Sequence, residues 1–298
     1  MSNLAFRIRG ACALALLLFP NAQAWGETRA LVVASFSILG DLVEAIAGDR
    51  VEVHTLVGPG VDAHTYTPSP SDARRLAGAD LVVVNGLGFE GWMDRLIVAS
   101  GFSGPTLIAS RGVEPIRIHG ERDPHAWQSL SNIEIYVDNI AVALAALDAD
   151  SAGFYAARVA DYRVRLQRLD AEIHDFVGSL PAEGRRVVTS HDAFGYFEAS
   201  YGLRFLAAKG VQPDADISAR ELAGLIRQIR EERVAGIFIE NMSDPRLMET
   251  VARETGVPIG GVLYSDALSP ADGPAATYLE LIQHNLEALR SALVSDAP

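Results

Sequence analysis

Three histidines and one aspartate in this sequence have the residue type and the placement of metal ligands. They stand in "DAHTY" (His64), "DPHAW" (His125), "TSHDAF" (His191) and "YSDAL" (Asp266). Each follows an apolar strand-like run or lies in a loop that leads into a helix. Imidazole nitrogens and a carboxylate oxygen suit a borderline divalent ion such as zinc, which three nitrogens and one oxygen can surround in a roughly tetrahedral shell.

Taken singly, each of these residues is more often an ordinary polar group of a loop than a ligand, so the metal hypothesis depends on their occurring together. The sequence has seven histidines. His54 lies within a strand-like run, and His174 and His284 lie beside helical apolar stripes, so we interpret these three as surface or flanking residues. We interpret His119 as a solvated loop histidine, and a transient contact with the metal during loading is the alternative.

The elements that must position the four residues alternate along the chain. Apolar β-branched runs separated by amphipathic helical stretches predict an α/β fold with two lobes, each a parallel sheet covered by helices. Open α/β sheets bind ligands at the carboxyl ends of their strands, and two of the four residues come from each lobe. A bound metal would therefore lie in the crevice between the lobes. The expected strands are 31–35, 51–57, 80–86 and 106–110 in the first lobe and 185–190, 234–240 and 257–265 in the second.

One long helix is expected between the two series of strands. Apolar residues from Tyr155 to Leu180 recur at alternating spacings of four and three. A helix from about Ser151 to Leu180 would span roughly 45 Å and could run along both lobes. The same stripe could form a coiled-coil dimer, but packing within the chain is the simpler interpretation beside two sheets.

Four sites have the pattern of a helix-starting capping box, in which a hydroxyl residue is followed three positions later by an acid. The first of them, with Pro70 at the opening helical position, directly follows the loop of His64 and predicts that a helix begins there. The pairs are Ser69 with Asp72, Ser131 with Glu134, Ser218 with Glu221 and Thr277 with Glu280.

The first residues have the layout of a cleavable signal peptide. Arg7 and Arg9 precede the apolar run "ACALALLLF", and "AQA" before Trp25 offers the small residues of a cleavage site. We therefore expect an exported, periplasmic protein. The expected divisions are a signal peptide (1–24), an N-terminal α/β lobe (25–147), a linking helix (148–182) and a C-terminal α/β lobe (183–298).

Composition narrows the chemistry and the partners. Cys12 is the only cysteine and lies in the expected signal peptide, which leaves nitrogen and oxygen as ligands. Loss of Arg7 and Arg9 takes the formal net charge from −13 to −15, so nucleic acid is not an expected partner. Beyond the signal peptide no stretch approaches 18 uninterrupted apolar residues, and we expect a soluble product.

In combination, several motifs resemble the metal-binding solute receptors of bacterial ABC importers for zinc and manganese. The resemblance covers nearly the whole chain after the signal peptide. It implies two α/β lobes joined by a long backbone helix, with delivery of the metal to a membrane permease. The motifs are "GPGVDAHTYTPSPSD" (58–72), "ADLVVVNGLGFEGWMDRL" (79–96), "DPHAW" (123–127), "SHDAFGYF" (190–197), "SARELAGLIRQIREERVAGIFIE" (218–240) and "YSDALS" (264–269).

The resemblance implies His64 and His125 as ligands from the first lobe and His191 and Asp266 as ligands from the second. Manganese-type relatives have a glutamate at the position of His191, and a third imidazole favours zinc. Many zinc-type members have a long histidine-rich loop before the second ligand. Here the matching segment, 114–124, is short and contains only His119.

Three acids near the expected ligands could orient an imidazole without binding the metal themselves: Asp62, Asp192 and Glu240. A secreted zinc hydrolase is a remote alternative, because catalytic zinc keeps an open position for water. The sequence instead offers a fourth ligand, and it has neither an HExxH nor a G-x-S-x-G motif. A surface adhesion protein is a second alternative, but no anchor or extended interaction segment is visible.

The sequence therefore predicts a protein that is not an enzyme and that captures zinc in the periplasm, with Zn²⁺ as transported ligand. A receptor for manganese or another divalent metal is the alternative within the same class. The expected partner is the inner-membrane permease of an ABC importer, and the receptor is expected to be a monomer. Whether a periplasmic metallochaperone supplies the metal is left open by the sequence.

Overall fold

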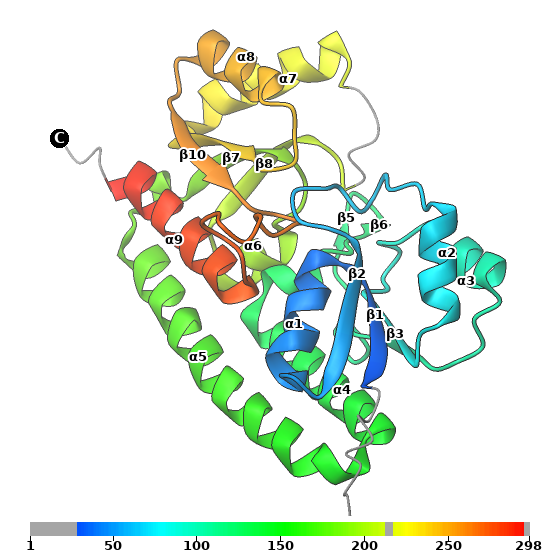
Figure 1. The fold of residues 1–298 in the computed structure, drawn as a ribbon. Coiled ribbons are helices and arrows are strands. Elements are labelled where there is room, and N and C mark those ends of the chain that lie inside the picture. Colours follow the sequence, from blue (N-terminus) through cyan, green and yellow to red (C-terminus); the bar gives the residue numbers. More distant parts are fainter. Residues whose placement is uncertain (1–28, 212–216, 295–298) are drawn as a thin grey trace, which may run out of the picture.

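The computed structural model of the chain describes residues 29–211 and 217–294 (Figure 1). The expected signal peptide, residues 1–24, lies outside them. Two parallel sheets form two lobes, and one long helix runs along the side of both (Figure 1). The predicted fold class is therefore confirmed.

The first sheet has the strand order β2-β1-β3-β4, with all neighbours parallel. Its central strands are continuous apolar runs because helices cover both of their faces, as buried parallel strands require. The strands are β1 (Ala30–Phe36), β2 (Val51–Val57), β3 (Leu81–Val84) and β4 (Thr106–Ile108), and the helices are α1 (Ser37–Ala47), α2 (Pro70–Ala77), α3 (Met93–Ser100) and α4 (Leu130–Leu147).

The second sheet has the order β10-β9-β7-β8, again with parallel neighbours. Counted in chain order, both sheets have the same arrangement, in which the second strand flanks the first and the third and fourth follow on its other side. The strands are β7 (Arg186–His191), β8 (Arg204–Lys209), β9 (Gly236–Glu240) and β10 (Ile259–Leu263), and the helices are α6 (Gly195–Tyr201), α7 (Ala219–Glu232), α8 (Arg246–Thr255) and α9 (Tyr278–Val294).

Short elements connect these parts. A two-stranded hairpin follows β4 in the chain, and single 3₁₀ turns precede α4, α5 and β7. These are β5 (Arg117–Ile118), β6 (Glu121–Arg122), η1 (Ala126–Gln128), η2 (Ala149–Ser151) and η3 (Ala182–Gly184).

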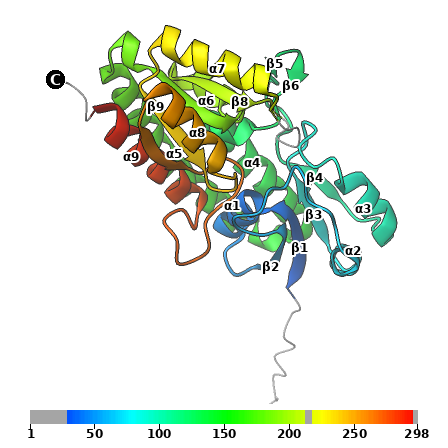
Figure 2. The ribbon, with the colours of Figure 1, turned by 90° about the horizontal axis from the view of Figure 1, so that it is seen from above.

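The linking helix α5 (Ala152–Ser179) has 28 residues, about 42 Å at 1.5 Å per residue. Its apolar stripe from Tyr155 to Phe176 is buried within the chain, as the intramolecular interpretation predicted. One continuous apolar core includes residues of α1, α4, α5 and α9 together with Val187 and Phe238 of the second sheet. The lobes therefore share a core and are not joined by the helix alone. Figure 2 shows the two lobes and α5 from above.

Among the described residues, α4 is the one helix with the length and hydropathy of a membrane span. It packs against α1 and α5, and one of its faces, which includes Ile133, Val137 and Ile140, is buried in the shared core. This placement is that of a core helix.

Three of the four predicted capping boxes are present. Ser69 caps α2 with Asp72, Ser218 caps α7 with Glu221, and Thr277 and Glu280 exchange the same reciprocal hydrogen bonds at the start of α9. The prediction at Ser131 was wrong. The helix there begins at Leu130 directly after a 3₁₀ turn, and the hydroxyl of Ser131 instead contacts that of Ser129.

Candidate metal centre

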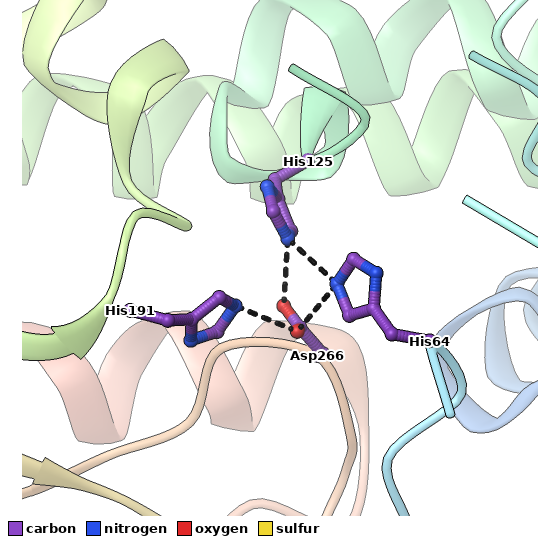
Figure 3. Close-up of side chains that lie close together, drawn as sticks. All are labelled: His64, His125, His191 and Asp266. Atoms are coloured by element: carbon purple, nitrogen blue, oxygen red, sulfur yellow. Dashed lines mark hydrogen bonds and ion pairs between the residues drawn. The ribbon is translucent and has the colours of Figure 1, made fainter. Parts of the chain in front are cut away.

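The structure brings the four predicted residues to one point between the lobes (Figure 3). One nitrogen or oxygen atom from each lies within 4.8 Å of the corresponding atoms of the others. Nε2 of His64 is 3.0 Å from Nε2 of His125 and 3.3 Å from Oδ2 of Asp266. The same Oδ2 is 3.1 Å from Nε2 of His191, and Oδ1 of Asp266 is 3.7 Å from Nε2 of His125. All four side chains are at most 1% exposed.

His64 is presented by the loop between β2 and α2. The carboxylate of Asp62 accepts a hydrogen bond from the backbone N–H of His64 at 2.7 Å and another from the Thr65 hydroxyl at 3.1 Å. This local turn fixes the backbone of the loop just before Ser69 begins the capping box of α2. The edge of the His64 ring packs against Phe89, with 4.5 Å between the ring centroids.

His125 is presented by an equivalent turn in which Asp123 occupies the position of Asp62. Oδ1 of Asp123 accepts a hydrogen bond from the backbone N–H of His125 at 2.9 Å and lies 2.7 Å from its ring Nδ1. A hydrogen on Nδ1 leaves, in the neutral ring, the lone pair of Nε2 facing the centre. Asn85 further fixes this loop by donating to the carbonyl of Pro124 at 2.9 Å.

His191 is the last residue of β7, and Glu240 is the last residue of the neighbouring strand β9. The Glu240 carboxylate accepts from the backbone N–H of His191 at 2.8 Å and lies 2.5 Å from its ring Nδ1. The same carboxylate accepts from the hydroxyl of Ser265 at 2.7 Å, next to Asp266. Glu240 thus holds His191 directly and also holds Ser265, the residue before Asp266.

Asp266 lies in the loop after β10, and hydrogen bonds join this loop to the first lobe. The carbonyl of Ser265 accepts from Trp127 Nε1 and from Gln128 Nε2, both at 2.8 Å. On the other side of Asp266, the carbonyl of Leu268 accepts from the backbone N–H of Gly60 at 2.9 Å. The loop is therefore attached to both segments that present His64 and His125.

The electrostatics of the centre show strong coupling between the carboxylates and the rings. Burial acts to lower the pKa of His125, but the carboxylates of Asp266 and Asp123 raise it to about 9. Burial is likewise outweighed at His191, where Glu240 and Asp266 raise the pKa well above its ordinary value. Burial would raise the pKa of Asp266, yet the two imidazoles hold it well below its usual range. Without a metal, the neighbouring carboxylates therefore favour the protonated rings of His125 and His191.

Several buried atoms of the centre form ion pairs but no hydrogen bond of normal geometry. Within the described residues, these include Nε2 of His191 and both carboxylate oxygens of Asp266. Burial makes poorly directed contacts of polar atoms costly. The residues thus fit a cation that would coordinate these atoms.

The three acids that sequence reasoning singled out have different roles. Glu240 contacts the ring of His191, whereas Asp62 fixes the loop backbone of His64. Burial, reinforced by the charge of Asp123, raises the pKa of Asp192 to about 6. Sequence reasoning missed Asp123, although the pattern Asp-x-His before both His64 and His125 could have indicated it.

The remaining histidines do not belong to the cluster of candidate ligands. His119 has a left-handed backbone with φ of 51° at the turn of the β5–β6 hairpin. His174 lies on α5 at 3.7 Å from Asp170, and Nε2 of His284 is 3.1 Å from the carbonyl of Val262.

Comparisons with known proteins agree with this arrangement. The model of the family described as zinc-uptake complex component A, periplasmic (ZnuA), matches residues 32–292. The chain is 32% identical over 273 residues to the manganese ABC transporter substrate-binding lipoprotein PsaA of Streptococcus pneumoniae, with 88% of each covered. It is 33% identical over 263 residues to the iron-binding protein YfeA of Yersinia pestis, covering 87% of this chain and 84% of that one.

Among solved structures, the periplasmic zinc binding protein TroA from Treponema pallidum is similar with a TM-score of 0.85 and 31% identity. The match covers 89% of this chain and 99% of TroA. The resemblance noted from the motifs is thus confirmed. The chain belongs to the ZnuA family of periplasmic metal-binding receptors, the substrate-binding proteins of ABC metal importers.

Proposed function

We propose that this receptor captures zinc in the periplasm through His64, His125, His191 and Asp266 and delivers it to the permease of an ABC importer. The observation that supports the proposal is the spacing of the donor atoms. Zinc–ligand distances of about 2.0–2.2 Å in a tetrahedral shell place neighbouring ligand atoms about 3.4 Å apart. Four of the separations between donor atoms, 3.0, 3.1, 3.3 and 3.7 Å, bracket that value, and one donor atom of each residue lies within 4.8 Å of those of the others.

The donor set supports zinc over manganese. Three imidazoles with one carboxylate suit zinc, whereas manganese prefers sites rich in carboxylate and water oxygens. The relatives named above are described as binding manganese, iron or zinc, so manganese is the second candidate. Because the family consists of receptors and not enzymes, the zinc hydrolase alternative is rejected.

The test is metal analysis and competition titration on the mature protein and on four single variants: His64→Ala, His125→Ala, His191→Ala and Asp266→Ala. We expect zinc to outcompete manganese and each variant to lose affinity by a factor of about 100 or more, since each removes one of four ligands. His284→Ala, outside the cluster, is the matched control and should bind like the wild type. Preference for manganese would overturn the zinc assignment, and full affinity in all four variants would overturn the site.

Further parts of the proposal concern location and assembly. A cleaved signal peptide at residues 1–24 and a monomeric receptor remain predictions, as do the lobe boundaries at 25–147, 148–182 and 183–298. N-terminal sequencing of the exported protein and light scattering on it would check the cleavage and the monomer. A periplasmic metallochaperone would reveal itself by faster zinc transfer than free diffusion of the metal allows.

A further inference from the structure

Lys209 is the only lysine in a sequence whose other basic side chains are arginine or histidine. It is the last residue of β8, a strand that sequence reasoning did not identify. In the parallel pairing of β7 with β8, Lys209 is the direct partner of His191. Residues paired in this way extend their side chains to the same face of the sheet. The fold therefore places one ammonium group beside a proposed ligand.

Lys209 lines two hollows in the surface, one of which it shares with His191. One, of about 700 Å³, is lined by Lys209 and His191 together with Asp62 of the opposite lobe. The other, of about 740 Å³, is lined by Lys209 together with Asp192 and His119. Lys209 thus lines one hollow together with a proposed ligand and another together with Asp192, the residue that follows this ligand.

Because the centre contains several carboxylates, a positive charge at Lys209 would affect how strongly it binds a cation. Asp123, Glu240 and Asp266 are completely buried around the four donor atoms. In their ionised form they supply three negative charges to a divalent ion. A receptor must release its metal to the permease, and a centre with excess negative charge retains a cation strongly.

We propose that the Lys209 ammonium lowers the affinity of the centre for a divalent cation and speeds its release. The proposal rests on the metal-binding function proposed above, but it applies to zinc and manganese alike. A nearby positive charge repels a divalent ion, and a repulsion of about 1.4 kcal/mol weakens binding by about tenfold. The effect acts through charge and requires no contact with the metal.

The test compares Lys209→Gln with Lys209→Arg, because only the first removes the charge. Arg168→Gln is the matched control: it removes the same charge from the exposed side of α5, where Arg168 is paired only with Glu172. Each full-length mature protein is titrated with zinc and with manganese against a competing chelator at low and at high salt. Stopped-flow transfer of the metal to excess chelator gives the dissociation rate.

We expect Lys209→Gln to bind about tenfold more tightly and to release the metal more slowly, with a difference that shrinks at high salt. Lys209→Arg and Arg168→Gln should behave like the wild type. A merely structural role for Lys209 would not produce tighter binding, a salt dependence and rescue by arginine together. Unchanged or weaker binding in Lys209→Gln, or equal tightening in Lys209→Arg, overturns the proposal. A wild type that binds neither metal would overturn the proposed function itself and, with it, this inference.

Discussion

At the scale of single residues, each proposed histidine ligand is held by a carboxylate. Asp123 contacts the ring of His125, Glu240 contacts the ring of His191, and Asp62 fixes the backbone of His64. The two carboxylates that contact rings orient the imidazole and raise its basicity. The candidate metal centre therefore includes these three carboxylates in addition to its four candidate ligands.

Glu240→Gln should weaken zinc binding by about 10–100-fold, because the amide keeps the shape of the side chain but loses the charge that faces Nδ1 of His191. Chelator competition measures the effect. Glu249→Gln, an exposed change on α8, is the control and should leave the affinity unchanged. An affinity of Glu240→Gln equal to that of the wild type would show that the contact does not tune the centre.

Zinc affinity should rise with pH. The pKa of His125 is raised to about 9 and that of His191 well above its ordinary value in the metal-free centre, so zinc must displace protons at neutral pH. Each displaced proton adds about a factor of ten in affinity per pH unit. Competition titrations at pH 6, 7 and 8 measure the slope, and a flat profile would rule out proton displacement.

At the scale of elements, α9 is anchored to the first lobe by Asp41 of α1. Its carboxylate accepts from the backbone N–H of Tyr278, the first residue of α9, at 2.8 Å. Burial raises the pKa of Asp41 to about 6, although this hydrogen bond acts to lower it. This hydrogen bond joins the two lobes, but the ionised carboxylate of Asp41 loses favourable contacts with water when it is buried.

Asp41→Asn should stabilise the protein at pH 8. A carboxyl whose pKa is raised by folding contributes stability that is present at low pH and is lost as the pH rises through about 6. The asparagine keeps an acceptor for Tyr278 without the buried charge, which should add about 2 kcal/mol to the free energy of unfolding at pH 8. Urea denaturation at pH 5 and pH 8 measures it, and the exposed change Asp49→Asn is the control. Destabilisation of Asp41→Asn at pH 8 would contradict the argument.

Elements of strong periodicity were predictable, and weakly marked ones were not. The long apolar stripe predicted α5 to within a residue of its ends, because a single buried face repeats over the whole helix. β8 was missed because "RFLAAK" is short, has a charged residue at each end and contains no β-branched residue. The capping box predicted at Ser131 did not form, because the preceding 3₁₀ turn lets α4 begin one residue earlier, at Leu130.

At the scale of the whole molecule, the lobes are joined by a shared core, by α5 and by hydrogen bonds that do not involve the metal. Trp127 and Gln128 of the first lobe both donate to Ser265 of the second, and the hydroxyl of Tyr278 donates to the carbonyl of Trp127. None of these contacts uses a side chain of a candidate ligand, so they form without a metal between the lobes. A wide hinge opening would break them.

Metal removal should therefore produce only small lobe movements. We expect helices and strands to shift by about 1–2 Å and larger changes to be confined to loops. Small-angle X-ray scattering of the metal-free and zinc-bound protein should give nearly superimposable profiles. Gln128→Ala, which removes one of the two donors to Ser265, should enlarge the difference between the states. A large rigid-body rotation of the wild-type lobes would refute the prediction.

The sequence by itself determined the donor types, their order along the chain, the alternation of strands and helices and the long linking helix, because these depend on residue chemistry and on periodicities read locally. Only the tertiary structure decided which groups meet. Glu240 reaches His191 across 49 positions of sequence, and Lys209 becomes its neighbour through a strand that local pattern did not reveal. Such contacts arise from the pairing of parallel strands, whose partners are distant in sequence because a crossover connection must separate them.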